Sequence, residues 1–335
     1  MHLSLIVPAF NRPGLLREAL ASACAQDPPV FEIIVVDDGS SPAVDESQLR
    51  RAFDDRIRVL RNDRTLGIDR VREIGARAAR GDLVWQLDDD DLLAPGAVGA
   101  CVEAFEQDPE LEVLFVDVEG FGSQRVRHAA AQADALDRLL QRLAVETRGA
   151  DPVALDGQLL SALLYSVPQA FQHPVVRRGS LLRVWDLRAR LHGAGSLGKD
   201  DRDDDPFHGN LNEAEWAILA SALCRCAFLP APLYRVRCEG QGLFSIDAGA
   251  HRQARAHLAL KRRLFAQGAG LPELAPWRPE FRRAYARALL ELAHVQGHAA
   301  TSEALPLLLR AMIVDPGWAP VAALLKLPLR AMRSS

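Results

Sequence analysis

The sequence predicts an α/β protein with a doubly wound, mostly parallel sheet and a C-terminal helical extension. Three observations support this fold class. Short apolar runs alternate with amphipathic stretches through the first third of the chain, which is the strand–helix order of a parallel sheet. The runs are continuously apolar, as expected of strands that helices cover on both faces. From Ala248 onward the pattern is helical.

The individual elements follow from these runs in chain order. Pro13 and Pro95 suit the first turn of a helix, where a backbone N–H is not needed. Gly81 is expected to stop the helix before it. Two late runs, Cys226–Leu229 and Leu233–Val236, flank a Pro-Ala-Pro segment and predict two further strands. The early strands are expected at Leu3–Val7, Phe31–Val36, Ile57–Leu60, Leu83–Leu87 and Val113–Val116, and the early helices at Pro13–Ala25, Ile68–Ala79 and Pro95–Glu106.

Three regions are expected along the chain. Residues 1–120 contain the alternating pattern and form the first half of the sheet domain. Residues 121–245 mix helical, loop and strand patterns and form its second half, with Gly193–Asn212 as a loop rich in Gly and Asp. Residues 246–335 form a C-terminal helical module.

Composition and charge exclude several classes of protein. The 335 residues include 40 Lys and Arg and 44 Asp and Glu, so the net charge of −4 gives no positive field for nucleic acid. Five cysteines without a C-x-x-C pair indicate a reducing compartment. The longest uncharged run, Gly157–Val176, contains prolines, glutamines and a histidine that a bilayer does not tolerate. The first residues show no secretory pattern, so a cytoplasmic protein is expected.

The most informative feature is the position of the acidic residues relative to the strands. Asp37 and Asp38 follow the second strand, and Asp88–Asp91 follow the fourth. Carboxyl ends of parallel strands meet at one sheet edge, so these carboxylates should gather there. Packed carboxylates repel, and a hard divalent ion that also holds phosphates would order them. Alternatively, the first cluster is a turn, and the second is a solvated loop in which Asp91 caps a helix.

At this point the sequence resembles a known family. In order, LSLIVPAFNR, EIIVVDDGS, RNDRTLGIDRVREIGARAARGDLV and LDDDDLLAPGAV resemble the blocks of family 2 inverting glycosyltransferases, which use nucleotide sugars. The match covers about a third of the chain. The resemblance implies a Rossmann-like GT-A fold in which residues 1–120 bind the nucleotide sugar and residues 121–245 bind the acceptor.

The resemblance also implies roles for single residues. Asp38, together with Asp37, would contact the base or ribose, and Arg72 falls at the position of the family's arginine near the nucleobase and diphosphate. The family often has Asn after that arginine, whereas this sequence has Glu73. Asp88 and Asp90 would be the acids of the D-x-D motif that hold Mn²⁺ or Mg²⁺, with Asp90 as the direct ligand. The nucleotide sugar would contact Pro8, Ala9, Phe10, Arg12, Asp37, Asp38, Arg72, Asp88 and Asp89.

Inverting transfer needs a carboxylate that takes the proton of the acceptor hydroxyl. The family supplies it from an E-D-like motif at the start of a helix, upstream of a turn that FLPAPLYRVR resembles. Glu213 and Glu215 are the candidates here, although A-E replaces the usual E-D. Glu213 is preferred because it lies nearer the preceding loop. The other interpretation is that both glutamates stabilise the first turn of the helix through its dipole.

The expected reaction is therefore metal-dependent transfer of a sugar, with inversion, from a nucleotide-diphosphate sugar to an acceptor hydroxyl. A UDP-sugar is the first choice of donor, and a carbohydrate, a lipid-linked group or a protein is the acceptor class. Residues 321–335 place three cationic groups among apolar ones, which fits either peripheral membrane contact or packing against the body.

Two other functions stay open from the sequence. A nucleotidyltransferase on a related fold would need a Gly-rich phosphate loop near residues 8–14, where only Gly14 occurs. A non-catalytic GT-A-like scaffold would explain the unusual A-E at the position of the base. Release of nucleoside diphosphate from a sugar donor separates the three functions.

Overall fold

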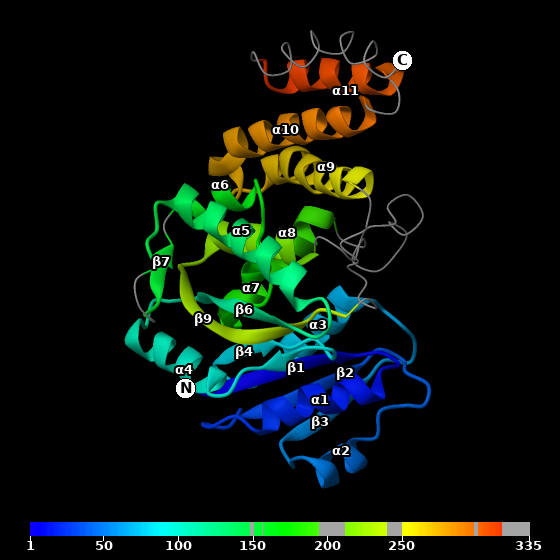
Figure 1. Cartoon of the computed structure of the whole chain (residues 1–335), viewed down its shortest axis with the longest axis vertical. Helices are drawn as coiled ribbons and strands as arrows, with labels where there is room; N and C mark the ends of the chain where they lie inside the picture. The colour runs from blue at the N-terminus through cyan, green and yellow to red at the C-terminus, as the bar shows by residue number, and fades with distance from the viewer. Residues whose placement is uncertain (148–150, 156, 194–211, 240–249, 298–300, 317–335) are drawn as a thin grey trace. The chain divides into compact units, whose positions relative to one another are not determined.

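The computed structural model describes residues 1–147, 151–155, 157–193, 212–239, 250–297 and 301–316. The chain divides into two compact units (Figure 1). The first consists of Met1–Asp200 with Asn212–Gly242, and the second of Asp201–Leu211 with Leu243–Ser335. The expected loop Gly193–Asn212 lies outside the described residues except for its two ends.

One mixed sheet forms the centre of the first unit. Its strands run in the order β3-β2-β1-β4-β8-β6-β9-β5, and β7 pairs with β9. The first four of these are parallel, whereas β8 is antiparallel to both of its neighbours. The sequence therefore predicted the mostly parallel α/β sheet correctly. The strands are β1 (Leu3–Ala9), β2 (Glu32–Asp37), β3 (Ile57–Arg61), β4 (Leu83–Gln86), β5 (Leu92–Leu93), β6 (Val113–Phe121), β7 (Val153–Leu155), β8 (Val175–Arg177) and β9 (Cys226–Arg237).

Helices cover both faces of this sheet, which explains why β1 and β2 are buried along their whole length. Leu5 packs with residues of α1 and α4 on one face, and Ile6 packs against α3 on the other. Of the described helices, those of the first unit are α1 (Pro13–Cys24), α2 (Glu46–Ala52), α3 (Ile68–Ala78), α4 (Ala97–Gln107), α5 (Arg125–Leu143), α6 (Leu159–Leu163), α7 (Arg178–His192) and α8 (Asn212–Leu223), and those of the second are α9 (Ala250–Ala266), α10 (Arg278–Gly297) and α11 (Thr301–Val314).

Three local expectations were wrong. Gly81 does not end α3, which stops at Ala78; a Cβ at Gly81 would lie 2.7 Å from the Ser4 hydroxyl oxygen, so the glycine permits close approach to β1. Pro95 precedes α4, which begins at Ala97 after Gly96 with φ +73°. The two late strands form one strand, β9, because irregular pairing with β6 around Asp117 accommodates the Pro-Ala-Pro segment. The short α2 and β5 were not predicted.

The packing of α3 on β1 gives a prediction about stability. A Cβ at Gly75 of α3 would lie 2.4 Å from Ile6 Cγ2, so Gly75→Ala should destabilise the protein by about 1–3 kcal/mol through overpacking. Gly179 of α7 has open space around its Cβ position, so Gly179→Ala should stabilise by up to about 1 kcal/mol through helix propensity. Urea unfolding measures both changes, and equal effects of the two substitutions would contradict the packing argument.

Candidate active site

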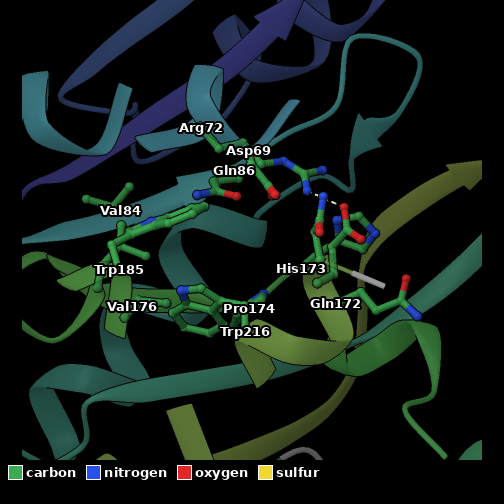
Figure 2. A pocket seen from close by; sticks show the side chains of 13 residues that line it. Asp69, Arg72, Val84, Gln86, Gln172, His173, Pro174, Val176, Trp185 and Trp216 are labelled. Carbon is green, nitrogen blue, oxygen red and sulfur yellow. Dashed lines mark hydrogen bonds and ion pairs between the residues drawn. The ribbon is translucent and has the colours of Figure 1, made fainter. Parts of the chain in front are cut away.

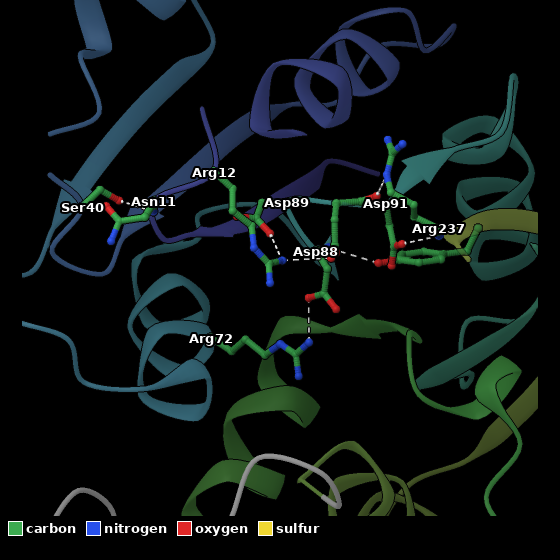
Figure 3. A network of polar contacts seen from close by, with 10 residues as sticks. Asn11, Arg12, Ser40, Arg72, Asp88, Asp89, Asp91 and Arg237 are labelled. Atoms are coloured by element: carbon green, nitrogen blue, oxygen red, sulfur yellow. Dashed lines mark hydrogen bonds and ion pairs between the residues drawn. The ribbon is translucent and has the colours of Figure 1, made fainter. Parts of the chain in front are cut away.

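The loops after β1, β2 and β4 meet at the carboxyl edge of the sheet, as the strand-end rule predicts. Asn11, after β1, receives a hydrogen bond from the Ser41 N–H at 2.8 Å, and its own N–H donates to the Ser40 hydroxyl at 3.0 Å. Its neighbour Arg12 reaches the acidic run after β4 (Figure 3). Pro8 and Ala9 are the buried end of β1, and Phe10 beside them is exposed.

The two acids that follow β2 have different surroundings. Asp37 is fully buried and accepts hydrogen bonds from the Ser40 and Val44 N–H groups and an ion pair from Arg61. Burial alone would raise the pKa of Asp37, but these donors outweigh it and hold the pKa below its ordinary value. This carboxylate is occupied by its own turn and by Arg61, and the nucleotide contact predicted for Asp37 and Asp38 stays a prediction.

Asp38 is held by the segment that leads from β3 into α3. Its carboxylate accepts from Asn62 Nδ2 at 2.8 Å and from the N–H groups of Leu66 and Gly67 at 2.8 and 3.0 Å. A carboxylate has about four acceptor positions, so one remains for a ligand. Gly67 directly precedes α3 as its N-cap residue, with φ +90°, a conformation that glycine adopts without strain.

Arg72 joins the acidic run to the start of α8. It lies on α3 with its side chain 5% exposed, and Nη2 contacts Asp88 Oδ1 at 2.7 Å. Its Nη1 forms a short ion pair with Glu213, which is 141 positions away in sequence. Burial alone would raise the pKa of Asp88, but the Arg72 charge outweighs burial and lowers it below its ordinary value. One guanidinium thus holds Asp88, which is a predicted acid of the D-x-D motif, and Glu213, which is the preferred candidate for the base.

The middle acids of the run face Arg12. Its Nη1 lies 3.3 Å from Asp89 Oδ1 and 2.9 Å from Asp90 Oδ2 (Figure 3). Burial raises the pKa of Asp89 to about 7, with Arg12 opposing the rise. Burial and the charge of Asp88 also raise the pKa of Asp90. Arg12 therefore connects the β1 loop to Asp89 and Asp90, which are predicted to contact the nucleotide sugar and the metal.

Asp91 does not cap α4, contrary to one interpretation of the sequence. It is buried and accepts a hydrogen bond from the Arg237 N–H of β9 at 2.8 Å. Burial raises the pKa of Asp91 well above its ordinary value. One ligand atom each of Asp88, Asp91 and His173 lie within 4.8 Å of one another, so among the described residues these three could hold a metal ion. Asp90 is not in this group, and its role as the direct ligand stays a prediction.

His173 is held against β9. Its ring stacks on Tyr234 with centroids 4.2 Å apart, and its backbone carbonyl accepts from the Trp85 indole at 3.0 Å. Burial lowers the pKa of His173, so the neutral imidazole that binds metals is favoured. The Tyr234 hydroxyl accepts from the N–H of Asp88 at 3.0 Å, which fixes the start of the acidic run.

The second candidate for the base, Glu215, belongs to a buried ion network. Its Oε2 accepts from Arg188 Nε of α7 at 2.7 Å and lies 2.7 Å from His192 Nε2. Arg188 Nη2 also donates to Asp69 of α3 and to Asn212, both at 2.9 Å. Arg188 and Glu215 are each at most 2% exposed, so this network fixes the start of α8 from inside.

A pocket opens beside Arg72 and Glu213 (Figure 2). It lies between α3, α7, α8 and the strands β4 and β8. Glu213 lines it and Glu215 does not. Its lining residues are Asp69, Arg72, Val84, Gln86, Gln172, His173, Pro174, Val176, Leu181, Trp185, Asn212, Glu213 and Trp216.

Several residues of this site were not found from the sequence. Arg188 looks like any helical arginine, and Tyr234 and Arg237 belong to a strand whose pairing with β6 spans more than a hundred residues. The proximity of His173 to Asp88 depends on β8 pairing with β4. No local pattern carries that information.

Solved structures define the fold class. A fragment of TarS from S. aureus, residues 1–349, has a TM-score of 0.55 and 15% identity, covering all of this chain and 92% of that one. A mannosyltransferase from Pyrobaculum calidifontis, in complex with GDP-Man and Mn²⁺, has a TM-score of 0.53 and 18% identity, covering 97% and 86%. The chain therefore has a GT-A-type α/β fold.

Sequence comparison then shows which family the first part of the chain is similar to. The model named "Glycosyl transferase family 2" matches residues 4–148. The O-antigen biosynthesis protein RfbC of Myxococcus xanthus is 29% identical over 287 residues, which cover 84% of this chain and 20% of that protein. Across three curated relatives, the matched regions span 20–37% of the relative's own length. Within the described residues, no helix is both long and apolar enough to cross a membrane.

The buried network around Arg188 gives a prediction about stability. Arg188→Ala leaves Glu215 and Asp69 without their shared cation, so we expect a loss of about 3–5 kcal/mol in the free energy of unfolding. Arg225→Ala is a matched control, because Arg225 is 49% exposed and its ion pairs should contribute less than about 1 kcal/mol. Urea denaturation compares them, and a small effect at Arg188 would show that the network does not hold α8.

The raised pKa of Asp89 gives a prediction about pH. The folded value of about 7 exceeds the ordinary 3.8, so the charged form is disfavoured in the folded protein. The contribution of Asp89 to the free energy of unfolding is fully present below about pH 4. It is lost as the pH rises through about 7. The melting temperature of Asp89→Asn minus that of the wild type should therefore increase between pH 5 and pH 8. A constant difference across that range would contradict it.

Proposed function

We propose that this protein is a glycosyltransferase that moves a sugar, with inversion and in a metal-dependent manner, from a UDP-sugar to an acceptor hydroxyl. The observation that supports this most directly is the pair of contacts made by Arg72. The Arg72 guanidinium forms ion pairs with both Asp88 and Glu213. Arg72 and Glu213 line the pocket, and Asp88 belongs to the group of side chains that could hold a metal. The match of residues 4–148 to the family 2 model and the nucleotide-sugar complex of a protein with this fold support the same class of reaction.

Each residue has a role in this proposal. Asp38 contacts the base or ribose from the loop after β2, and Arg12 lies where it can offset the charge of the diphosphate. Glu213 takes the proton of the acceptor hydroxyl as the hydroxyl attacks the anomeric carbon. The bond between that carbon and the diphosphate oxygen breaks on the opposite face, and UDP leaves. Arg72 orients Glu213 through their ion pair.

The residues present fit a divalent cation. Asp88 and Asp91 offer carboxylate oxygens and His173 offers a ring nitrogen, a donor set that suits Mn²⁺ and, through its oxygens, Mg²⁺. When bound, such an ion supplies positive charge that stabilises the leaving diphosphate. Asp90 is the remaining candidate ligand from the sequence, and it would first have to leave Arg12.

The acceptor belongs to a carbohydrate, a lipid-linked group or a protein. Peripheral membrane contact through residues 321–335 stays a prediction, since they lie outside the described residues.

The test of the function is release of UDP from UDP-sugars in the presence of Mn²⁺ and a panel of acceptors. Turnover should stop in excess EDTA and return when Mn²⁺ is added. A protein that binds UDP-sugars without turning over any of them would support a scaffold function, and turnover of nucleoside triphosphates would support a nucleotidyltransferase.

The assignment of the base gives a sharper prediction. Glu213→Gln keeps the size of the side chain but cannot take a proton, so transfer should fall about 10²–10⁴-fold while UDP-sugar affinity stays within threefold. Glu215→Gln should mainly lower the melting temperature, because its carboxylate pairs with Arg188 in the buried network. Loss of transfer in a folded Glu215→Gln protein, with Glu213→Gln fully active, would move the base to Glu215.

A further inference from the structure

The pocket beside Glu213 has two chemically different ends. Figure 2 shows Val84, Trp185 and Val176 together on one side, and Arg72 and His173 on the other. The apolar end is formed by residues of β4, β8 and α7, and the polar end includes Arg72, which contacts Asp88 of the acidic run. A ligand that fills it should therefore have an apolar portion attached to a polar ring.

Buried donors without partners line this pocket. Among the described residues, six buried side-chain atoms have no hydrogen-bond partner, and three of them are Arg72 Nε, Trp185 Nε1 and Trp216 Nε1. All three belong to residues that line the pocket and are at most 7% exposed. Unpaired buried N–H groups are rare in folded proteins. Three donors around one pocket indicate a ligand that brings an acceptor oxygen.

The charges around the pocket restrict that ligand. Asp69 and Glu213 line it, and Asp88 lies against Arg72, so carboxylates already neutralise the nearby arginines. A further anion would be repelled. The hydrogen-bond acceptor of the ligand should therefore be a neutral carbonyl oxygen. The apolar surroundings of the two indoles suit a methyl group next to that carbonyl. Gln86, also on the lining, offers an amide oxygen that can accept from an N–H.

We propose that this pocket binds the acylamino group of an N-acylated amino sugar, such as an acetamido sugar. The carbonyl oxygen accepts from the indole N–H groups of Trp185 and Trp216, and the methyl packs at the apolar end. This inference rests on the proposed glycosyltransferase function. The acylamino group can belong to the donor sugar or to the acceptor sugar, and binding measurements separate the two.

The test compares ligands that differ only in this group. Isothermal titration in the presence of Mn²⁺ should show that UDP-GlcNAc binds at least tenfold more tightly than UDP-glucose. Trp216→Phe and Trp185→Phe remove the N–H donors, so each should reduce this preference roughly three- to tenfold while UDP-glucose affinity stays within twofold. Trp277→Phe, in the second unit, is the matched control and should keep the full preference.

A second titration shows whether the acylamino group belongs to the donor sugar or to the acceptor sugar. If the donors bind equally, N-acetylglucosamine and glucose are titrated into the protein saturated with UDP and Mn²⁺. Preference for N-acetylglucosamine that is lost in Trp216→Phe assigns the pocket to the acceptor and supports the inference. No preference in either arm, although UDP binds, would overturn the inference and leave the proposed function intact. Failure of UDP and every UDP-sugar to bind would overturn the proposed function, and this inference with it.

Discussion

The site depends on one buried guanidinium. Arg72 is 5% exposed, and a charge so removed from water is tolerated only when it is paired. Its partners, Asp88 and Glu213, come from the end of β4 and the first turn of α8. These elements are far apart in sequence, and the arginine can be buried only if both are in place. Burial of Arg72 therefore couples correct docking of α8 on the sheet to assembly of the site, which is why the pocket and the candidate metal ligands surround the same residue.

The topology of the sheet concentrates negative charge, since it brings six aspartates to one edge. The chain itself supplies the balancing charges from Arg61, Arg12 and Arg72. Each acid then has a different environment. Arg72 lowers the pKa of Asp88, while burial raises that of Asp89 to about 7. Neighbouring carboxylates in one run thus differ in how strongly their surroundings favour the charged form.

How much of the fold and the site could be predicted depends on how far apart in the sequence the interacting residues lie. Apolar periodicity and the strand-end rule located the parallel strands and the acidic edge, because both are local properties of the sequence. The pairing of strands that are far apart in the sequence could not be predicted in the same way. His173 lies close to Asp88 only because β8 runs antiparallel beside β4, and Gly81 is needed for approach to Ser4 rather than as a helix stop. The family resemblance predicted that Arg72 lies near the nucleotide, and this stays a prediction, whereas its contact with Glu213 could not be predicted without the position of α8.

Glu213 and Glu215 show how packing separates two residues that the sequence offered together as candidates for the base, with Glu213 preferred. Two positions apart on a helix, they point about 200° apart, so only one can face the pocket. Glu215 faces Arg188, which also holds Asp69 and Asn212. Asp69 lies one turn before Arg72 on α3, and Asn212 directly precedes Glu213 on α8. Arg72 and Arg188 therefore both connect α3 to α8, at adjacent turns. Arg188 does so inside the core, and Arg72 does so at the pocket. The buried glutamate fixes the rotation of α8, and that rotation is what leaves Glu213 facing the pocket.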